Sequence, residues 1–519
     1  MSSLRQLRPH QEIALDGLKT SLVTGHRRPV LQLPTGAGKT VIAAHIVDGA
    51  LRKRNRIAFC VPTIGLVDQT FERFVENGID PSAMGVMQAD HHWRRPHAPV
   101  QIATAQTLAR RSLPDVGVVV IDECHVQHKV YQAWMGLPEW HGKPFIGLSA
   151  TPWAKGMAKH WDDLIKPIGI ADLIAGEYLS KFRVFAPSKP DLSGVRTVAG
   201  DYHEGDIAER MNQPKLVADI VETWMARGEG RPTLCFCVDR NHARSVHDEF
   251  ASVGVPVAYV DANTPREERT AIGQQLAAGT VKVVCNIGTL TTGIDWDVRC
   301  LILARPTKSA MLFVQIIGRA LRTAEGKADA IILDHSDTHM RLGMVTDIDR
   351  DALCDGSADR AAKREREDKT PLPKCCPQCS ALMPVGEKTC LACGHEMPRP
   401  RVAVADGELV EFGSGRVAGK ARDSVAAFLR SIGRAEAYGQ LLHIARSKGR
   451  KDGWAAYKYQ ALFGSMPNRQ SRAIIAPCPE MLSWVRSQDI AWAKSRRRES
   501  DAEVMARVAR ELTTGASHA

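Results

Sequence analysis

Several features that define other protein classes are missing from this 519-residue sequence. It contains no run of about 18 consecutive apolar residues, so we expect no membrane span and no membrane partner. The N-terminus, MSSLRQLRPHQE, lacks the apolar core of a secretion signal, which predicts a cytoplasmic protein. No repeat of fixed period is present.

A disulfide framework is also not indicated, although the chain contains 13 cysteines. Eight are scattered, and several of these lie in apolar runs, as expected of reduced cysteines in a hydrophobic core: Cys60, Cys235, Cys237 and Cys285. The other five fall between Cys375 and Cys393, a crowding typical of a metal site in a reducing compartment.

Charge is nearly balanced over most of the chain. The net charge of +11 is concentrated in residues 399–519, which contain 21 Lys and Arg against 12 Asp and Glu. A basic tail on a near-neutral body predicts a polyanionic partner, because phosphate contacts give affinity that does not depend on sequence. A solvated basic surface without such a partner is the alternative.

Up to about residue 350, short apolar runs alternate with helical stretches, the pattern of parallel sheets covered by helices on both faces. Two sets of candidate strands predict two such α/β domains, joined near residues 181–200. The first set is Val30–Leu33, Ile57–Val61, Val116–Ile121 and Phe145–Leu148. The second set is Thr233–Val238, Val255–Val260, Val281–Cys285, Leu301–Ala304 and Ala330–Leu333.

A glycine-rich segment follows the first candidate strand and opens a helix. Its residues are typical of a loop whose backbone N–H groups surround a triphosphate: Leu33, Pro34, Thr35, Gly36, Ala37, Gly38, Lys39 and Thr40. Lys39 is placed to contact the β- and γ-phosphates, and the Thr40 hydroxyl to bind Mg²⁺. Leu33 stands where the strict pattern has its first glycine. The segment predicts a nucleotide site.

Two acidic residues, Asp122 and Glu123, end the apolar run Val116–Ile121. An acid at the carboxyl end of a strand can hold Mg²⁺, which is the role we assign to Asp122. Glu123 is placed to orient and deprotonate an attacking water. Surface acids after a strand are the alternative, but the position downstream of a phosphate loop favours the catalytic interpretation.

A third motif, Gln315-Ile316-Ile317-Gly318-Arg319-Ala320-Leu321-Arg322, carries two arginines spaced i, i+3. This spacing predicts that Arg319 and Arg322 project from one helix face. Two guanidiniums there can act as arginine fingers, stabilising charge on the γ-phosphate in the transition state. A solvated helix face is the alternative for an isolated RxxR.

Together these segments resemble the motifs of the superfamily 2 helicases, in family order over about residues 4–335. The resemblance implies two tandem RecA-like domains with ATP in the cleft between them, and Gln315, Arg319 and Arg322 in one catalytic motif. Leu7-Arg8-Pro9-His10-Gln11 resembles the motif that recognises adenine, which implies that Arg8 and Gln11 bind the nucleotide.

Further motifs extend the resemblance to nucleic acid. Val61-Pro62-Thr63 and Ala103-Thr104-Ala105-Gln106-Thr107 are similar to segments that touch the nucleic-acid backbone, which implicates Pro62, Thr63, Thr104 and Gln106. Ser149–Pro152 resembles the segment that couples hydrolysis to domain movement. Thr291–Asp295 resembles motif V, which implies that Gly293 and Asp295 face the nucleotide and Thr292 lies near the strand.

Within the superfamily, the stretch Thr289–Asp334 is similar to RadD-type DNA repair helicases and to phage-borne relatives, and more loosely to restriction-enzyme motor subunits. This implies an ATP-dependent DNA helicase or translocase in DNA repair, recombination or phage-type replication. Single-stranded or branched DNA is the expected partner. The alternatives are an RNA-dependent ATPase and an ATP-switched clamp without processive movement, and the intact Glu123 argues against the clamp.

The cysteine cluster contains two CxxC pairs, Cys376/Cys379 and Cys390/Cys393. Two pairs separated by ten residues predict a closed four-thiolate Zn²⁺ site, structural because no coordination position stays open. Cys375 can replace Cys376 as a ligand, but Cys376 gives the CxxC spacing. A redox pair is the alternative.

The tail beyond the cysteines interleaves basic residues with aromatic ones over residues 446–469. Trp454, Tyr457, Tyr459 and Phe463 either stack on unpaired bases or form the core of a small helical subdomain. We therefore expect five regions: RecA-like domains at 1–185 and 186–352, a charged linker at 353–374, a zinc ribbon at 375–398, and a basic, mainly helical nucleic-acid-binding or accessory region at 399–519.

Overall fold

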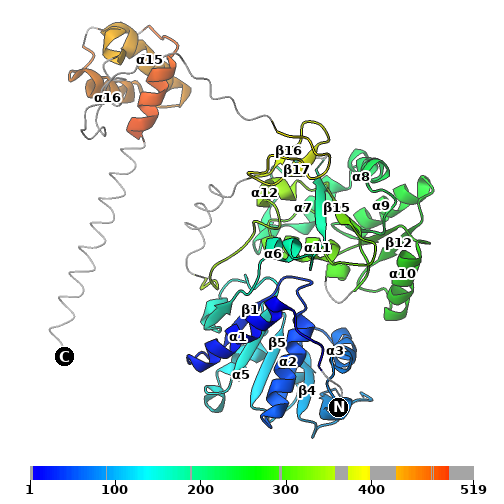
Figure 1. Cartoon of the computed structure of the whole chain (residues 1–519). Helices are drawn as coiled ribbons and strands as arrows, with labels where there is room; N and C mark the ends of the chain where they lie inside the picture. Colours follow the sequence, from blue (N-terminus) through cyan, green and yellow to red (C-terminus); the bar gives the residue numbers. More distant parts are fainter. Residues whose placement is uncertain are drawn as a thin grey trace, which may run out of the picture. The chain divides into compact units, whose positions relative to one another are not determined.

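The computed structural model describes residues 4–88, 91–186, 190–291, 295–356, 372–397, 428–468, 470–471 and 473–489 (Figure 1). The chain divides into two compact units, Met1–Pro400 and Arg401–Ala519, which are described separately below. Among the described residues, no helix is both long and apolar enough to cross a membrane.

The first sheet has seven parallel strands in the order β3-β4-β2-β5-β6-β1-β7. The strands are β1 (Pro29–Gln32), β2 (Ile57–Val61), β3 (Met84–Val86), β4 (Val100–Thr104), β5 (Val118–Asp122), β6 (Phe145–Ser149) and β7 (Asp163–Ile165). The helices of this domain are α1 (Pro9–Val23), α2 (Lys39–Arg52), α3 (Gly65–Glu76), α4 (Ala105–Leu108), α5 (Lys129–Met135) and α6 (Ile170–Ala175).

Both faces of this sheet are buried, as the nearly continuous apolar strands predict. On one face Phe59 and Val61 of β2 join a core cluster with residues of α1, α2 and α3. On the other face Ala58 and Cys60 pack in a cluster that includes residues of α5. Alternate residues of one strand therefore support opposite layers of helices, and the carboxyl ends of the strands are held at one edge.

The second sheet has eight strands in the order β12-β13-β11-β14-β15-β8-β17-β16. They are β8 (Lys181–Phe185), β11 (Thr233–Phe236), β12 (Val257–Val260), β13 (Val283–Asn286), β14 (Cys300–Leu303), β15 (Asp329–Asp334), β16 (Lys374–Cys375) and β17 (Ala381–Met383). The helices are α7 (Glu204–Met211), α8 (Pro214–Arg227), α9 (Arg240–Ser252), α10 (Arg266–Ala278), α11 (Ala310–Ala320) and α12 (Thr338–Leu342).

Short elements complete this unit. They are the hairpin of β9 (Thr197–Val198) and β10 (Asp201–Tyr202), and the 3₁₀ turns η1 (Pro81–Ala83), η2 (Pro138–Trp140), η3 (Met157–Lys159) and η4 (Thr289–Thr291). Figure 1 shows α11 on the side of the second sheet that faces the first. The two sheets with their helices are RecA-like domains, which confirms the predicted fold class.

The edge of the second sheet differs from the sequence-based division in two respects. β8 pairs in parallel with β15, so it belongs to the second sheet, whereas the expected boundary falls after Phe185. β17, from the cysteine-rich segment, pairs antiparallel with β8, and β16 pairs with β17. Neither long-range pairing leaves a signal in the local sequence, because each depends on residues about 150 or more positions away.

The second unit is a small helical fold. Its elements are α15 (Arg434–Ser447) and α16 (Asp452–Phe463), with helical residues also at 428–431 and 479–489. Leu441 and Tyr459 are buried in a core that also includes Trp484. A separate core of this kind agrees with the mainly helical region expected here, of which residues 399–427 and 490–519 lie outside the described ranges.

Candidate active site

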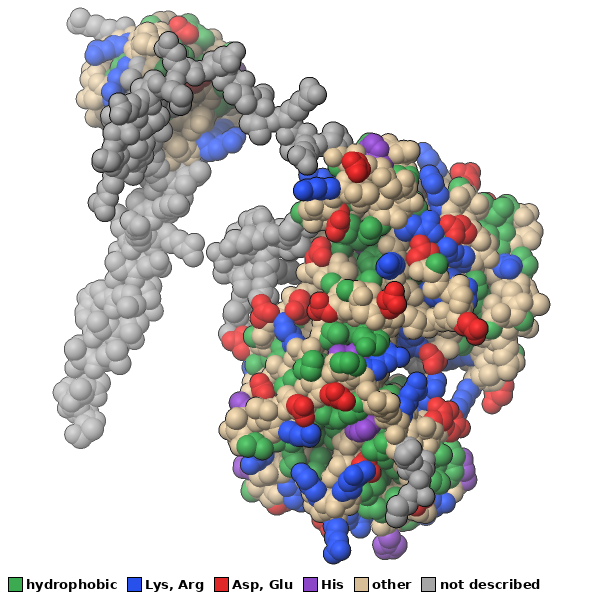
Figure 2. Space-filling model, in the orientation of Figure 1, with side chains coloured by type: hydrophobic (Ala, Val, Ile, Leu, Met, Phe, Trp, Pro, Cys, Tyr) green, Lys and Arg blue, Asp and Glu red, His purple; other side chains and the backbone are tan. Residues whose placement is uncertain are grey.

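A cavity of about 520 Å³ lies between the two RecA-like domains. Figure 2 shows Lys and Arg side chains gathered around the hollow between these domains. The predicted ATP-site residues that line the cavity are Arg8, Thr35, Gly36, Gly38, Lys39, Thr40, Asp122, Glu123, Asp295, Arg319 and Arg322. Three motifs of the first domain and two of the second thus meet in one space, as the resemblance implied. Thr292 and Gly293 lie outside the described residues.

The glycines of the phosphate loop are required by its backbone. Gly36 and Gly38 have φ values of +92° and +86°, a region that favours glycine. A Cβ on Gly38 would lie 2.2 Å from Nε2 of Gln11, and one on Gly36 would lie 2.6 Å from Cδ2 of Leu179. The departure at Leu33 has a structural reason, because its side chain is fully buried in the core.

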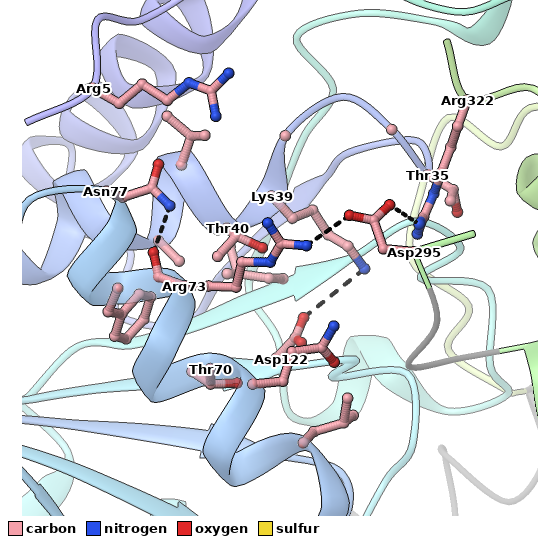
Figure 3. A pocket seen from close by; sticks show the side chains of 18 of the residues that line it. Arg5, Thr35, Lys39, Thr40, Thr70, Arg73, Asn77, Asp122, Asp295 and Arg322 are labelled. Carbon is pink, nitrogen blue, oxygen red and sulfur yellow. Dashed lines mark hydrogen bonds and ion pairs between the residues drawn. The ribbon is translucent and has the colours of Figure 1, made fainter. Parts of the chain in front are cut away.

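Lys39 is paired with the acidic residues at the end of β5. Its Nζ lies 2.5 Å from Oε1 of Glu123 and 3.9 Å from Oδ1 of Asp122 (Figure 3 draws Lys39 and Asp122). Burial alone would lower the pKa of Lys39, but the two carboxylates raise it above its ordinary value. The ammonium group is therefore fixed as a cation at the place where a triphosphate is expected.

The pKa values of the two acids shift in opposite directions. Burial raises the pKa of Asp122 to about 6, with Lys39 opposing this shift. Burial would also raise the pKa of Glu123, but Lys39 and His125 hold it well below the ordinary value. Glu123 has a φ of +49°, a left-handed conformation that is uncommon for a residue with a Cβ and that occurs preferentially at active sites.

The arginines of the third motif come from the second domain. Arg319 is 8% exposed, and its Nε donates to the backbone oxygen of Thr291 at 2.8 Å. Burial, with the neighbouring Arg322, lowers the pKa of Arg319 to about 9. The α11 helix ends at Ala320, so Arg322 lies just beyond it rather than on one helix face with Arg319 as predicted. Both guanidiniums still line the cavity.

Asp295 links Arg322 to the first domain. One carboxylate oxygen lies 2.6 Å from NH1 of Arg322, and the other lies 2.7 Å from NH2 of Arg73 on α3 (Figure 3). A second ion pair joins Arg266 of α10 to Asp68 of α3 at 2.7 Å. Sequence reasoning missed Arg73, because no motif marks this helix.

A polar network connects Glu123 to the second domain. His125 lies 3.2 Å from Oε2 of Glu123 and bonds to Oγ of Ser149 through Nδ1 at 2.8 Å. Gln315 of α11 reaches both Nε2 of His125, at 3.3 Å, and the hydroxyl of Thr151, at 3.1 Å. The segment predicted to couple hydrolysis to movement is thus in contact with Glu123 through His125, a residue to which sequence analysis assigned no role.

At the other end of the cavity lie residues of the adenine motif. Gln11 is 2% exposed; its Oε1 accepts from the N–H of Arg8 at 2.9 Å, and its Nε2 donates to the Ala37 oxygen at 3.0 Å. Gln11 therefore holds the phosphate loop; it is not among the residues that line the cavity, and its contact with a base stays a prediction. Tyr178, which sequence analysis missed, also lines the cavity.

The predicted nucleic-acid contacts lie at the carboxyl edge of the first sheet. Pro62 and the exposed Thr63 follow β2, and Thr104 ends the neighbouring β4. Thr104 caps α4 by accepting from the N–H of Thr107 at 3.2 Å, and Gln106 on the same short helix is exposed. The structure brings these four residues to adjacent strand ends; their contact with nucleic acid stays a prediction.

The four cysteines of the CxxC pairs converge on one point. Their Sγ atoms all lie within 4.8 Å of one another, with 3.7 Å between Cys376 and Cys393 and 3.6 Å between Cys379 and Cys390. A tetrahedron with Zn–S bonds of about 2.3 Å has S–S edges of roughly 3.8 Å. The donor set therefore fits a four-thiolate metal, and Cys376 rather than Cys375 belongs to it.

The aromatic residues of the tail separate into two groups. Tyr459 is 1% exposed, and Trp454 and Phe463 pack against the core of the helical unit. Tyr457 is 68% exposed. The core interpretation thus accounts for three of the four aromatics, and only Tyr457 stands in solvent, where stacking on a base is sterically open.

Comparisons with known proteins agree with this architecture. Residues 4–154 match the family model described as the res subunit of type III restriction enzymes, and residues 213–324 match the helicase conserved C-terminal domain. The chain belongs to the superfamily 2 helicases. The two matched segments cover the phosphate loop, the acid pair, and the Gln315–Arg322 motif.

Curated relatives of this helicase include phage and fungal proteins. A 51.5 kDa protein of a Lactococcus phage is 26% identical over 376 residues, covering 71% of this chain and 78% of that one. IRC3 of Saccharomyces cerevisiae is 27% identical over 365 residues, which cover 63% of this chain and 51% of the yeast protein. The ATP-dependent DNA helicase UvsW of phage T4 is 23% identical over 360 residues, 65% and 70% of the two chains.

Among solved structures, a fragment from Vibrio vulnificus described as an HsdR subunit of a type I restriction enzyme superposes with a TM-score of 0.51. It is 21% identical and covers 68% of each chain. This likeness shows the fold of the helicase.

Proposed function

We propose that this helicase hydrolyses ATP to drive movement on, or remodelling of, DNA. The observation that carries the proposal is the shared cavity, in which Lys39 and Glu123 of the first domain face Arg319 and Arg322 of the second. A triphosphate in this cavity would contact cations from both domains, so its binding and loss would alter the interface between them.

Hydrolysis requires attack of a water oxygen on the γ-phosphorus, with loss of the bond to the β-phosphate oxygen and transfer of the water proton to a base. Glu123 suits the base because it is ionised at neutral pH and its pKa is held low chiefly by Lys39, so a triphosphate that takes Lys39 as its own partner makes the carboxylate more basic. A γ-phosphate that reaches Lys39 replaces Glu123 as its partner and frees the carboxylate for the water. Arg319 and Arg322 then offset the charge that develops on the transferred group.

The cavity also offers ligands for a divalent cation. Thr40 and Asp122 line it together, and a hydroxyl with a carboxylate is a donor set that fits Mg²⁺, which keeps several waters. When bound, Mg²⁺ would neutralise charge on the β- and γ-phosphate oxygens. Asp122, whose pKa burial raises to about 6, is ionised at neutral pH and able to act as this ligand.

Transmission to the second domain is assigned to the network of Glu123, His125, Gln315 and Thr151. A change in the partner of Glu123 alters its contact with His125, which Gln315 shares across the cleft. The chain therefore has a direct polar path from the hydrolysed bond to α11. Repeated closure and opening would shift the grip on a strand held at the exposed Thr63 and Gln106.

The basic tail suits either nucleic acid, because DNA and RNA both carry phosphate charge. DNA is favoured over RNA because the T4 relative is named as a DNA helicase. The proposed setting is DNA repair, recombination or phage-type replication.

The test is ATP turnover of the full chain with single-stranded DNA, duplex, forked DNA and RNA of matched length, followed by strand displacement on the best activator. We expect DNA, single-stranded or forked, to raise turnover at least about tenfold over the basal rate. Stimulation by RNA alone would overturn the DNA assignment. Stimulation by DNA without strand displacement would establish a translocase or remodeller instead of an unwinding enzyme.

We further propose that the four-cysteine cluster holds a structural Zn²⁺. The Sγ–Sγ distances support this, and the matched control is Cys375, which is exposed and outside the cluster. The Cys390→Ser/Cys393→Ser double variant is expected to lose the bound zinc atom measured by elemental analysis, whereas Cys375→Ser keeps it. Equal zinc content in the double variant and the wild type would refute the site.

A further inference from the structure

The covalent connection from the first domain to the second passes through residues 176–180, between the end of α6 and the start of β8. Three consecutive residues in this connection, Tyr178, Leu179 and Ser180, touch three different parts of the ATP site. We call them the crossing segment. No motif in the sequence marks it, and the catalytic scheme above does not use it.

Tyr178 contacts the adenine motif. Its ring packs edge-on against His10 with centroids 4.8 Å apart, and the guanidinium carbon of Arg8 lies 5.0 Å from the Tyr178 centroid. The N–H of Tyr178 donates to the Leu173 oxygen at 2.8 Å, which ties the residue to α6. Arg8 and Tyr178 both line the cavity, so this cation–π pair lies at its wall, where a bound ligand can meet it.

Leu179 contacts the phosphate loop and the arginine segment. It is 2% exposed, and its Cδ2 occupies the space directly beside Gly36. Its backbone forms an isolated antiparallel bridge with Arg322. A shift of the loop at Gly36 therefore displaces the side chain of Leu179. Because the backbone of Leu179 is bonded to Arg322, a predicted arginine finger, the shift also affects Arg322.

Ser180 also bonds to the backbone around Arg322. Its N–H donates to the Leu321 oxygen at 2.7 Å, and its hydroxyl donates to the Arg322 oxygen at 3.2 Å. The residue is 5% exposed, so these bonds form in a site with little access to water. The backbone of Arg322 is consequently fixed by two neighbouring residues of the crossing segment.

We propose that the crossing segment is a positioning element that links recognition of the purine base to placement of the arginine finger. Tyr178 orients Arg8 against the face of the base. Because Leu179 and Ser180 are bonded to the backbone at Arg322, a movement of the crossing segment also moves Arg322. The ligand class is a purine nucleoside triphosphate. The inference rests on the proposed function for its ligand and extends it to the choice of base.

The test compares nucleotide preference in the full-length chain. Tyr178→Leu removes the ring, whereas Tyr178→Phe keeps it and serves as the conservative control. With saturating DNA, Tyr178→Leu is expected to raise the KM for ATP about tenfold and to leave the KM for CTP within about twofold, because a cation–π brace is worth roughly this factor. Tyr178→Phe should keep the wild-type ratio of the two KM values.

A double-mutant cycle identifies the route of the effect. Arg8→Ala alone should lower the ATP preference by a similar factor, and the Tyr178→Leu/Arg8→Ala chain should lose little more than either single variant. Effects that simply multiply, or an unchanged preference in Tyr178→Leu, would overturn the proposal. Arg8→Ala also covers the case in which Tyr178→Leu fails to fold, because it leaves the crossing segment intact.

The link to Arg322 is measured through kcat. Ser180→Ala removes one bond to the Arg322 backbone, so we expect kcat with ATP to fall about three- to fivefold. Tyr178→Leu should lower kcat with ATP in the same direction, and the Tyr178→Leu/Ser180→Ala double variant should lose little more than either single variant. An altered preference with unchanged kcat would contradict the assigned roles. Competition of ATP and CTP against a fluorescent ATP analogue measures the same base preference without turnover, so the inference is separable from failure of the hydrolysis proposal.

Discussion

The two halves of the ATP cleft are built differently. In the first domain two predicted catalytic groups, Lys39 and Glu123, pair with each other, and Glu123 also contacts His125. In the second domain the predicted arginines are held mainly by their own domain, Arg319 at the Thr291 oxygen and Arg322 at Asp295. The first half is therefore organised to bind a triphosphate, whereas the second half has to exchange partners before it reaches one.

This difference predicts that the second half governs turnover and not affinity. Arg319→Ala is expected to lower kcat about 10³-fold or more, the usual effect of losing an arginine finger, with KM for ATP changed less than about threefold. Phosphate release in the presence of DNA measures both. Arg52→Ala, at an exposed position on α2, is the control and should keep full turnover. A large rise in KM with unchanged kcat for Arg319→Ala would remove the distinction between the halves.

Within the first half, binding and catalysis are expected to separate. Lys39→Ala should abolish detectable binding of a fluorescent ATP analogue, because the only cation of the phosphate loop is lost. Glu123→Gln should retain binding and lower kcat by about 10²–10⁴-fold, the range for a missing general base. Near-normal turnover in Glu123→Gln would show that another group accepts the proton.

A buried carboxylate supports α11, the helix of the second domain that carries Arg319. Asp334 is fully buried and accepts bonds from the N–H and Nδ1 of His339, whose ring packs edge-on against Phe313 of α11. Asp334→Asn is expected to lower the free energy of local unfolding by about 3 kcal/mol, because His339 loses the buried carboxylate to which it donates. Hydrogen exchange in β15 and α11 measures this, and Asp248→Asn, at an exposed carboxylate, should leave exchange unchanged.

The same carboxylate makes the second half acid-sensitive. Burial would raise the pKa of Asp334, but the bonds from His339 and Ser336 hold it well below the ordinary value of 3.8. Its contribution to stability is therefore complete above about pH 4 to 5 and is lost as the pH falls further. The protection factors of amides in β15, which correct for the intrinsic pH dependence of exchange, should fall below pH 4 in the wild type and show a flatter pH dependence in Asp334→Asn.

The smallest effect is expected where the two halves touch. Gln315→Ala removes the contacts with His125 and Thr151 but no group assigned to phosphate or water. We expect DNA-stimulated turnover to fall about tenfold and the basal rate to change less than about twofold. Equal loss of basal and stimulated rates would place Gln315 in the chemistry itself instead of the coupling.

Sequence analysis located the site residues that short sequence motifs define. Lys39, Asp122 and Glu123 each follow an apolar strand, and Arg319 lies in a compact motif, so a few neighbouring residues define them. His125 and Tyr178 were missed because their roles depend on partners far along the chain, Gln315 and Arg8. The candidate strands agreed with β1, β2, β5 and β6 to within a few residues. Four strands, β3, β4, β7 and β8, were not among the candidates, and two of them, β3 and β7, have only three residues each.

The hairpin that carries the cysteines also protects the second domain from association with other chains. Without β17, the strand β8 would present a row of unpaired backbone N–H and C=O groups at the sheet margin, which is a template for another strand. Met383 and Cys376 pack in the same cluster as Phe185 of β8, so the order of the hairpin and the cover of this margin depend on each other. Oxidation of these cysteines is therefore expected to disturb the hairpin, expose β8 and lower the solubility of the chain.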